Sequence, residues 1–249
     1  MLTTTVILAG LILLAALLYS SVGHAGASGY LAAMAFLSVP PEVMRPTALV
    51  LNLLVATIAT YRFARAGHFS HSLLWPFAIG SVPLAFIGGG LQLPGHWYKT
   101  LVGLVLLLAA VRLVQEHRTT RQADEPRLLK QVSMPLAIGA GAIIGLLSGL
   151  TGTGGGIFLS PLLLFTGWAA TRETGGVSAA FILVNSAAAL AGNIASVSAL
   201  PSALPLWAGA AIVGGLLGSE LGARRVATGT FRLLLALVLV VAGAKLILT

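Results

Sequence analysis

Apolar residues run through almost the whole chain, in stretches of the length that membrane helices need. We expect ten such segments, at about 3–22, 26–38, 46–61, 72–91, 98–113, 134–150, 153–167, 175–198, 204–221 and 231–248. About 20 consecutive apolar residues span a bilayer, and the second and seventh segments are short for a full crossing. Between the fifth and sixth segments the chain is clearly hydrophilic. The pattern predicts an all-α integral membrane protein with one polar linker.

The segments on the two sides of this linker resemble each other in order. The stretch 98–113 aligns with 231–246, because an aromatic residue, a base and a second base recur at the same spacing. Asn52 and Asn185 lie at the same offset. Such self-similarity indicates a repeat. We therefore expect three parts, a first membrane repeat at 1–113, a cytoplasmic linker at 114–133 and a second membrane repeat at 134–249, each repeat holding about four to five transmembrane or re-entrant helices.

The loop that carries most of the basic residues is the third loop in the first half but the fourth loop in the second half. In the first half the third loop carries Arg62 and Arg65, whereas in the second half the fourth loop carries Arg224 and Arg225. Cytoplasmic loops carry an excess of Lys and Arg, so we expect two repeats inserted in opposite directions. The linker then lies in the cytoplasm and both termini lie outside. Five crossings per half, or three crossings and a re-entrant hairpin, both satisfy this orientation.

Composition supports membrane embedding and removes several other classes of protein. Of the 249 residues 57% are apolar and 8% are charged, whereas a soluble domain has roughly a quarter charged residues. The absence of cysteine excludes a disulfide scaffold, thiolate metal sites and cysteine nucleophiles. The net charge of +8 does not indicate a nucleic-acid partner, because the bases lie in loops between spans. The apolar N-terminus lacks a basic start and is interpreted as the first membrane segment.

Two glycine-rich turns, each between the first and second segments of its half, form the candidate substrate-binding site. A helix that restarts at Gly26 or Gly154 would direct free N–H groups and its positive dipole end toward an anion. Matching helix breaks in two halves are typical of a transporter's binding site. The alternative is that such glycines only allow close helix packing, which we expect for 88–90 and 214–215. The candidate residues in the turns are Gly23, His24, Gly26, Ser28, Gly29, Thr151, Gly152, Thr153, Gly154, Gly155 and Gly156.

Polar residues within the other spans extend this site. Asn52 and Asn185 either complete a cavity near the membrane midplane or tie helices together, and Ser186 and Asn193 continue the second polar stripe. His24 could donate to an anion, titrate and couple transport to protons, or cap a broken helix. We expect no metal site and no cofactor.

Three charged features are assigned to less specific roles. Glu220 is expected to pair with Arg224, four residues further on. Arg45 and the Arg172–Glu173 pair are expected in loops after the short segments, where they either attract anions toward a vestibule or are simply interfacial.

Other function classes predict different behaviour. Residues 26–29 have the G-x-S-G form of a serine hydrolase, but this pattern is weak in a glycine-rich chain, and no later span holds a histidine as the base. We therefore expect no enzyme. An anion channel would show flux without saturation, and a structural or sensory membrane protein would show none. The sequence contains no G-x-x-x-x-G-K-[ST] nucleotide-binding motif, which argues against a self-contained ATP-driven pump.

The sequence GHAGASGY at 23–30, a proline-centred loop and the span with Asn52 resemble the TauE/SafE family, also called the 4-toluene sulfonate uptake permease family. GLTGTGGGIFLSP at 149–161 and the span with Asn185 are the counterparts. The resemblance implies a secondary transporter that moves a sulfur-containing anion, such as sulfite or an organosulfonate, across the cytoplasmic membrane, often outward, with the glycine-rich turns holding the substrate. His24 departs from the family pattern, which bears on the substrate and the coupling ion.

Overall fold

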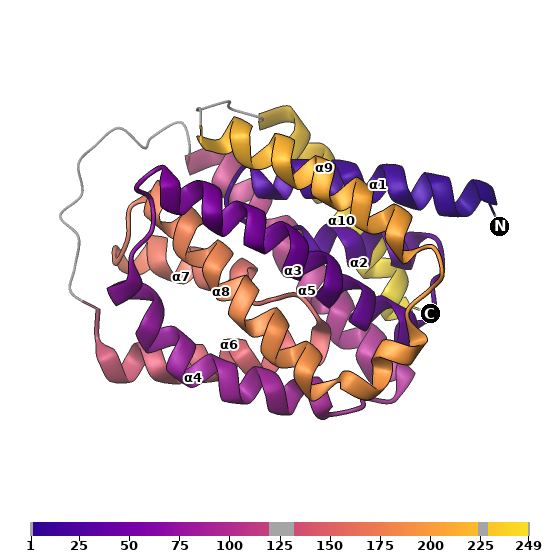
Figure 1. Ribbon diagram of the computed structural model, residues 1–249, viewed down its shortest axis with the longest axis horizontal. Coiled ribbons are helices and arrows are strands. Elements are labelled where there is room, and N and C mark those ends of the chain that lie inside the picture. Colours follow the sequence, from indigo (N-terminus) through magenta and orange to yellow (C-terminus); the bar gives the residue numbers. More distant parts are fainter. Residues whose placement is uncertain (1, 120–131, 224–228, 249) are drawn as a thin grey trace.

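The computed structural model describes residues 2–119, 132–223 and 229–248, and the regular elements in these ranges are all helices (Figure 1). The ten predicted apolar segments are confirmed as ten α-helices in the described chain. Their bounds are α1 Leu2–Ser20, α2 Ala27–Phe36, α3 Pro41–Arg65, α4 His71–Gly90, α5 Gly95–Thr119, α6 Met134–Thr151, α7 Gly156–Thr166, α8 Thr171–Gly192, α9 Leu204–Ala223 and α10 Gly229–Leu248, with a 3-10 turn at Ile194–Ala199 between α8 and α9.

Several predicted boundaries are wrong by four to six residues, and α8 ends at Gly192 rather than at 198. α3 begins at Pro41, five residues before the expected start, because proline is well suited to the first helical position. Arg45 therefore lies inside a helix, as do Arg172 and Glu173 in the first turn of α8. α5 continues to Thr119, so that the first six residues of the predicted linker are helical, and residues 120–131 lie outside the described ranges.

α2 and α7 are too short to cross a membrane. Their 10 and 11 residues rise about 15–17 Å, about half of the hydrocarbon core. Each folds back on the helix before it. A Cβ at Gly29 of α2 would lie 2.6 Å from the Cβ of Ala15 in α1, and a Cβ at Gly155 would lie 2.9 Å from Ile144 in α6. Each pair is therefore a helical hairpin that ends within the bundle.

Six described helices are long and apolar enough to cross a membrane, namely α1, α3, α4, α6, α8 and α9. Large apolar side chains cover the outside of the bundle, such as Ile143 and Phe165, which are 65% and 71% exposed. Contiguous exposed apolar surface of this kind marks a membrane contact. The chain is a multi-pass membrane protein.

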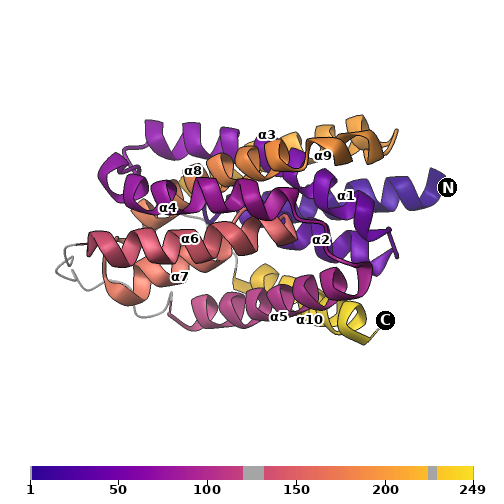
Figure 2. The ribbon, with the colours of Figure 1, turned by 90° about the horizontal axis from the view of Figure 1, so that it is seen from below.

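Helices of the first half pack against helices of the second half. α4 runs parallel to α6 and α1 runs parallel to α9, whereas α5 and α10 are antiparallel, as are α3 and α8 (Figures 1 and 2). The start of α1 and the end of α10 lie at the same end of the bundle (Figure 1). The two halves therefore form one intertwined bundle.

Glycines allow two of these contacts. A Cβ at Gly88 would lie 2.6 Å from the carbonyl oxygen of Leu146 in α6, and one at Gly214 would lie 2.3 Å from that of Leu13 in α1. The packing role predicted for 88–90 and 214–215 is confirmed at these positions. Small residues at the contact let two helix backbones approach closely in a membrane.

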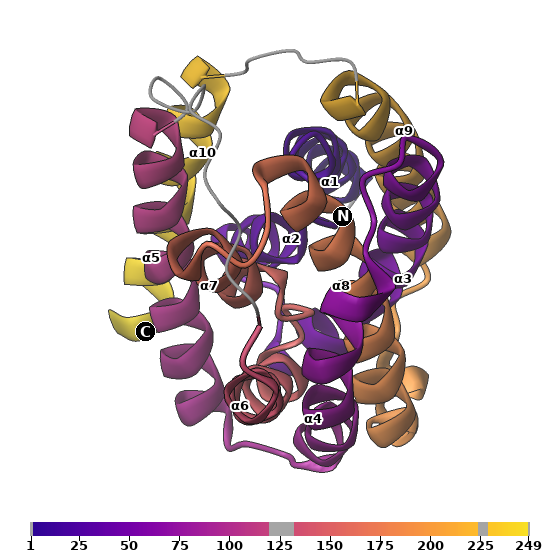
Figure 3. The same ribbon diagram turned by 90° about the vertical axis from the view of Figure 1, so that its left-hand side faces the viewer.

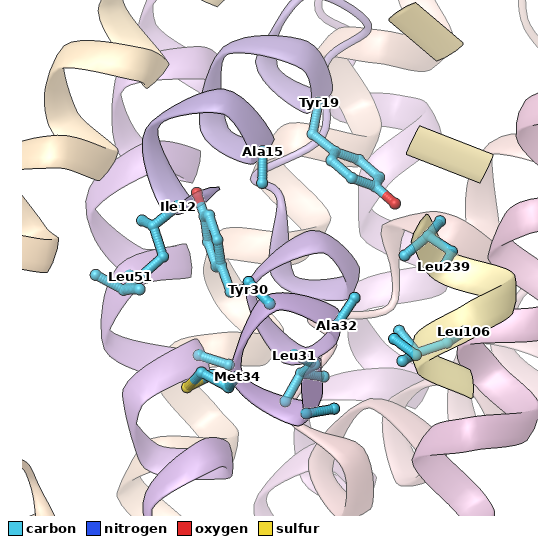
Figure 4. Close-up of a cluster of buried hydrophobic side chains, with 14 of the residues drawn as sticks. Ile12, Ala15, Tyr19, Tyr30, Leu31, Ala32, Met34, Leu51, Leu106 and Leu239 are labelled. Carbon is cyan, nitrogen blue, oxygen red and sulfur yellow. The ribbon is translucent and has the colours of Figure 1, made fainter. Parts of the chain in front are cut away.

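The short helix α2 lies at the centre of one apolar cluster. Tyr30, Leu31 and Met34 are fully buried, between Leu51 of α3 and Leu106 of α5 (Figure 4). Seen end-on, α2 and α7 lie inside the ring formed by the longer helices (Figure 3). The inner ends of both half-length helices are thus held in the interior, where the candidate site is.

Candidate functional site

The first glycine-rich turn joins α1 to α2 inside the bundle. Gly23 and Gly26 have φ values of 82° and 100°, a left-handed conformation that favours glycine. The Tyr30 hydroxyl donates to the carbonyl oxygen of Ala25 at 2.5 Å, and a Cβ at Gly26 would lie 2.8 Å from the Tyr30 ring. The turn is therefore closed over a buried tyrosine, and α2 starts at Ala27.

The second turn has three left-handed glycines, Gly152, Gly154 and Gly155. α7 begins at Gly156, two residues after the predicted restart at Gly154, because consecutive left-handed residues cannot join a right-handed helix. The hydroxyls of Thr151 and Thr153 are 2.9 Å apart and both residues are buried. The Thr151 hydroxyl also donates to the carbonyl oxygen of Leu147 at 2.7 Å. This turn therefore places two hydroxyls directly before the start of α7.

His24 connects the two turns. Its Nε2 lies 3.2 Å from the carbonyl oxygen of Gly156 and 2.9 Å from the hydroxyl of Ser160, which is 2.8 Å from the hydroxyl of Ser178. The histidine belongs to the first half and its partners belong to the second. These contacts link the two hairpins, a role that was not predicted from the sequence, whereas donation to an anion, coupling to protons and capping of a broken helix stay predictions.

Asn52 faces the second turn. Its Nδ2 lies 3.3 Å from the Ser186 hydroxyl and 3.5 Å from the carbonyl oxygen of Gly152, and it would lie 2.9 Å from a Cβ at Gly154. Its Oδ1 is buried and has no hydrogen-bond partner among the described residues. Asn52 therefore ties α3 to the second half and keeps one unused acceptor at the site.

Asn185 is bonded differently. Its Nδ2 donates to the carbonyl oxygen of Phe181 in the same helix at 2.9 Å, and its buried Oδ1 has no hydrogen-bond partner in the described chain. Asn193, expected to extend the same stripe, is the C-cap residue directly after the end of α8. The amide of Asn185 therefore adds polarity to the interior without joining two helices.

Other predicted binding residues have structural explanations. A Cβ at Gly23 would lie 2.4 Å from the Cα of Gly175 in α8, so that Gly23 allows α8 to approach, and Gly29 plays the same part between α2 and α1. Ser28 is buried in the first turn of α2, and none of the described contacts joins it to the second turn. A direct role for these three residues stays a prediction.

Arg45 is a buried cation that sequence reasoning placed in a loop. It is 6% exposed and donates to the carbonyl oxygens of Gly88, Gly89 and Leu91 at the C-terminal end of α4. A helix C-terminus carries partial negative charge, which stabilises a cation. A Cβ at Gly152 would lie 3.2 Å from the carbonyl oxygen of Arg45, so the arginine backbone lies directly against the second turn.

The predicted pair of Glu220 with Arg224 stays a prediction, and the described residues show another partner for the carboxylate. Glu220 forms a salt bridge with Arg62 of α3, whereas Arg224 lies outside the described residues. Both carboxylate and guanidinium are about one-third exposed. This pair joins the two halves near the end of the bundle opposite the chain termini.

Sequence reasoning missed Ser160 and Ser178 as members of the site. One signal was available for Ser178, which precedes Asn185 by seven residues, the interval by which Arg45 precedes Asn52. No comparable signal marked Ser160, since its contact with His24 joins residues 136 positions apart.

A serine next to a histidine is also what a hydrolase needs. The structure provides this contact at Ser160 rather than at Ser28, with Ser160 2% and His24 9% exposed. A peptide could not reach groups buried to this degree without a rearrangement of both hairpins. The arrangement suits a small occluded ligand better than a polypeptide.

The junction presents donors and neutral acceptors rather than carboxylates. Among the described residues no group of three or more His, Asp or Glu could hold a metal ion. Glu42 is exposed, Glu173 is half-buried at the start of α8, and Glu220 pairs with Arg62. Two cavities, of about 380 Å³ and 320 Å³, lie on the outside of the bundle and include none of the junction residues in their lining. The chemistry favours a small anion held by N–H and O–H groups.

Comparisons with known proteins agree with this picture. Residues 8–246 match the family model described as sulfite exporter TauE/SafE. A relative from Sinorhizobium fredii, named probable membrane transporter protein y4hK, is 40% identical over 232 residues, which are 93% of this chain and 94% of the relative. No solved structure matches the chain.

Proposed function

Because this membrane transporter belongs to the TauE/SafE sulfite exporter family, we propose that it is a secondary transporter that carries a small sulfur oxyanion, sulfite or an organosulfonate, out of the cell. The observation that carries the proposal is the meeting of two helix breaks inside the membrane, where His24 of one hairpin contacts Gly156 and Ser160 of the other. Matching breaks in two halves mark substrate sites in secondary transporters.

The substrate binds between the inner ends of the two half-length helices. The first-turn N–H groups of a helix lack partners within it, and those of α7 follow the left-handed Gly154 and Gly155. The hydroxyls of Thr151 and Thr153 lie beside them. A sulfonyl or sulfite group has three oxygens at tetrahedral angles, which accept from several such donors at once.

The two halves are proposed to be inverted repeats that move against each other. If α1 to α5 are equivalent to α6 to α10 in that order, the contact between α1 and α9 corresponds to the contact between α6 and α4. The contact between α2 and α10 corresponds in the same way to that between α7 and α5, and all four contacts are present. The equivalent helices α5 and α10 pair antiparallel, as do α3 and α8. These pairings support a two-fold axis in the membrane plane, the arrangement that alternating access uses.

A channel is the principal alternative within membrane proteins. Both cavities described above lie outside the junction, and the polar groups of the junction are buried. This closed arrangement supports a transporter that occludes its substrate. A channel would show flux that neither saturates nor responds to a proton gradient.

Binding of the substrate is tested with Gly154→Ala and the matched control Gly167→Ala. Both glycines are left-handed, at φ 78° and 71°, but a Cβ at Gly154 would lie 2.6 Å from Ile182, whereas a Cβ at Gly167 meets nothing within 4 Å. Both variants therefore carry the same cost of about 1–2 kcal/mol for placing an alanine in a left-handed conformation. Only Gly154→Ala also disturbs the site. Sulfite or methanesulfonate should raise the unfolding temperature of the wild type and of Gly167→Ala, but not of Gly154→Ala.

Saturating ligand, at about 100 times its dissociation constant, stabilises a protein by about 2.7 kcal/mol, so the shift is measurable in detergent. Chloride should give none. Equal stabilisation by sulfate would overturn the restriction to sulfite and sulfonates, and no stabilisation by any of these anions would overturn the proposed function.

A further inference from the structure

A cavity of about 320 Å³ is lined by the end of α2, the turn between α2 and α3, the start of α3, the start of α5 and the end of α10. It lies at the end of the bundle where α1 starts and α10 ends (Figure 1). Its polar groups come from Ser38, Lys99 and Lys245. This cavity takes no part in the junction described above.

The charged residues in its lining are both cations. Lys99 lies near the start of α5 and Lys245 near the end of α10, and both are half-buried. They face one cavity because α5 and α10 run antiparallel, which brings the first turn of one beside the last turn of the other. Two ammonium groups around a partly desolvated space attract an anion more strongly than the same charges in open water.

Lys245 is held in position by the chain that closes the cavity. Its Nζ donates to the carbonyl oxygen of Phe36 at 3.0 Å and to the hydroxyl of Ser38 at 2.8 Å. Ser38 adopts a left-handed φ of 58°, which is uncommon for a residue other than glycine. The lysine is therefore ordered before any ligand arrives, which lowers the entropic cost of binding.

A third cation lies further in. Met44 lines the cavity, and the next residue is Arg45, whose Nε is buried and has no hydrogen-bond partner in the described part of the chain. Charge on a buried guanidinium is costly unless it is compensated, and the carbonyl groups at the end of α4 offer only partial charges. Arg45 also lies against Gly152, so the residue that follows Met44 of the cavity lining contacts the second turn of the junction.

We propose that this cavity is a second, peripheral binding site for a small oxyanion, which passes between the junction and Lys99 and Lys245 by way of Arg45. The inference rests on the proposed function. A lipid headgroup offers similar phosphate chemistry at the membrane surface, but the inward position of Arg45 favours a free anion. With the orientation predicted from charge, the site lies on the outer face.

The test uses Lys99→Cys, since the chain has no native cysteine. The purified variant is labelled with either a cationic aminoethyl or an anionic sulfonatoethyl methanethiosulfonate, which give side chains of similar size and opposite charge. Sulfite uptake is then measured in proteoliposomes. We expect the anionic label to raise KM about tenfold at low ionic strength and the cationic label to keep it within about twofold of the wild type. In about 1 M salt the two should converge, because the Debye length falls to about 3 Å.

Arg65→Cys, labelled in the same ways, is the matched control, because Arg65 is an exposed cation at the opposite end of the bundle. Equal KM values for the two labels at position 99 would overturn the peripheral site. So would a charge effect that vanishes in liposomes of zwitterionic lipid alone, since the ligand would then be a lipid headgroup. Absence of sulfite uptake by the wild type would instead contradict the proposed function.

Discussion

Replacing Asn185 by leucine is expected to lower transport of the sulfur oxyanion by about 10- to 150-fold, the equivalent of one hydrogen bond to a charged group. The Asn185 amide is fully buried and, among the residues that the structure describes, bonds only to Phe181 in its own helix. Its removal therefore breaks no tertiary hydrogen bond, and the variant should remain folded. Initial uptake rates in proteoliposomes, with thermal unfolding measured in parallel, check both parts of this expectation.

Asn52→Leu should show the same loss of transport together with a loss of stability, because Asn52 contacts Ser186 of the other half. Thr57→Val is the matched control. Its hydroxyl bonds to Leu53 in the same helix, as the Asn185 amide does to Phe181, but Thr57 is exposed on the outside of the bundle. Transport that persists in both asparagine variants would show that neither residue belongs to the site.

Gly145→Leu is expected to prevent the close packing of α4 and α6 and to leave little folded protein. A Cβ at Gly145 would lie 2.2 Å from the carbonyl oxygen of Ser81 and 2.6 Å from its Cα. These are backbone atoms of a neighbouring helix, so no side chain can move aside to make room. Overpacking costs about 1–3 kcal/mol when the structure can adjust, and the leucine should exceed that range. The yield of monodisperse protein and its unfolding temperature are the readouts.

Gly139→Leu controls for the change in composition. Gly139 lies in the same helix, and a Cβ there meets nothing within 4 Å. Leucine favours helix over glycine by roughly 1 kcal/mol, so this variant should be as stable as the wild type or more stable. If Gly145→Leu also folds normally, the contact between α4 and α6 is looser than described.

Much of the fold could be predicted from apolar runs alone. A membrane helix forms all its backbone hydrogen bonds within itself, and its side chains face lipid or other helices, so it is recognised in the sequence as an uninterrupted apolar stretch. The ten segments and the shortness of α2 and α7 could be predicted on that basis. Helix starts were less accurate. Arg45 and Pro46 suggested a loop, although the helix had already begun at Pro41 and the arginine donates to carbonyl groups of α4.

The glycine turns could be located from the sequence, but the contacts between them could not. Ser160 meets His24 across 136 positions, and Glu220 of α9 meets Arg62 of α3. Both contacts depend on how two halves pack, which local spacing does not encode. The repeat offers partial help, since Ser178 holds the position relative to Asn185 that Arg45 holds relative to Asn52.

The most direct measurement of the central claim is flux in proteoliposomes that contain the purified chain. Sulfite, methanesulfonate, sulfate and chloride are supplied in turn, with and without an imposed pH gradient. The proposed function predicts saturable, gradient-sensitive flux of sulfite or the sulfonate, and its loss in Asn185→Leu. No flux of any anion from folded protein, or chloride flux that neither saturates nor responds to the gradient, would contradict it.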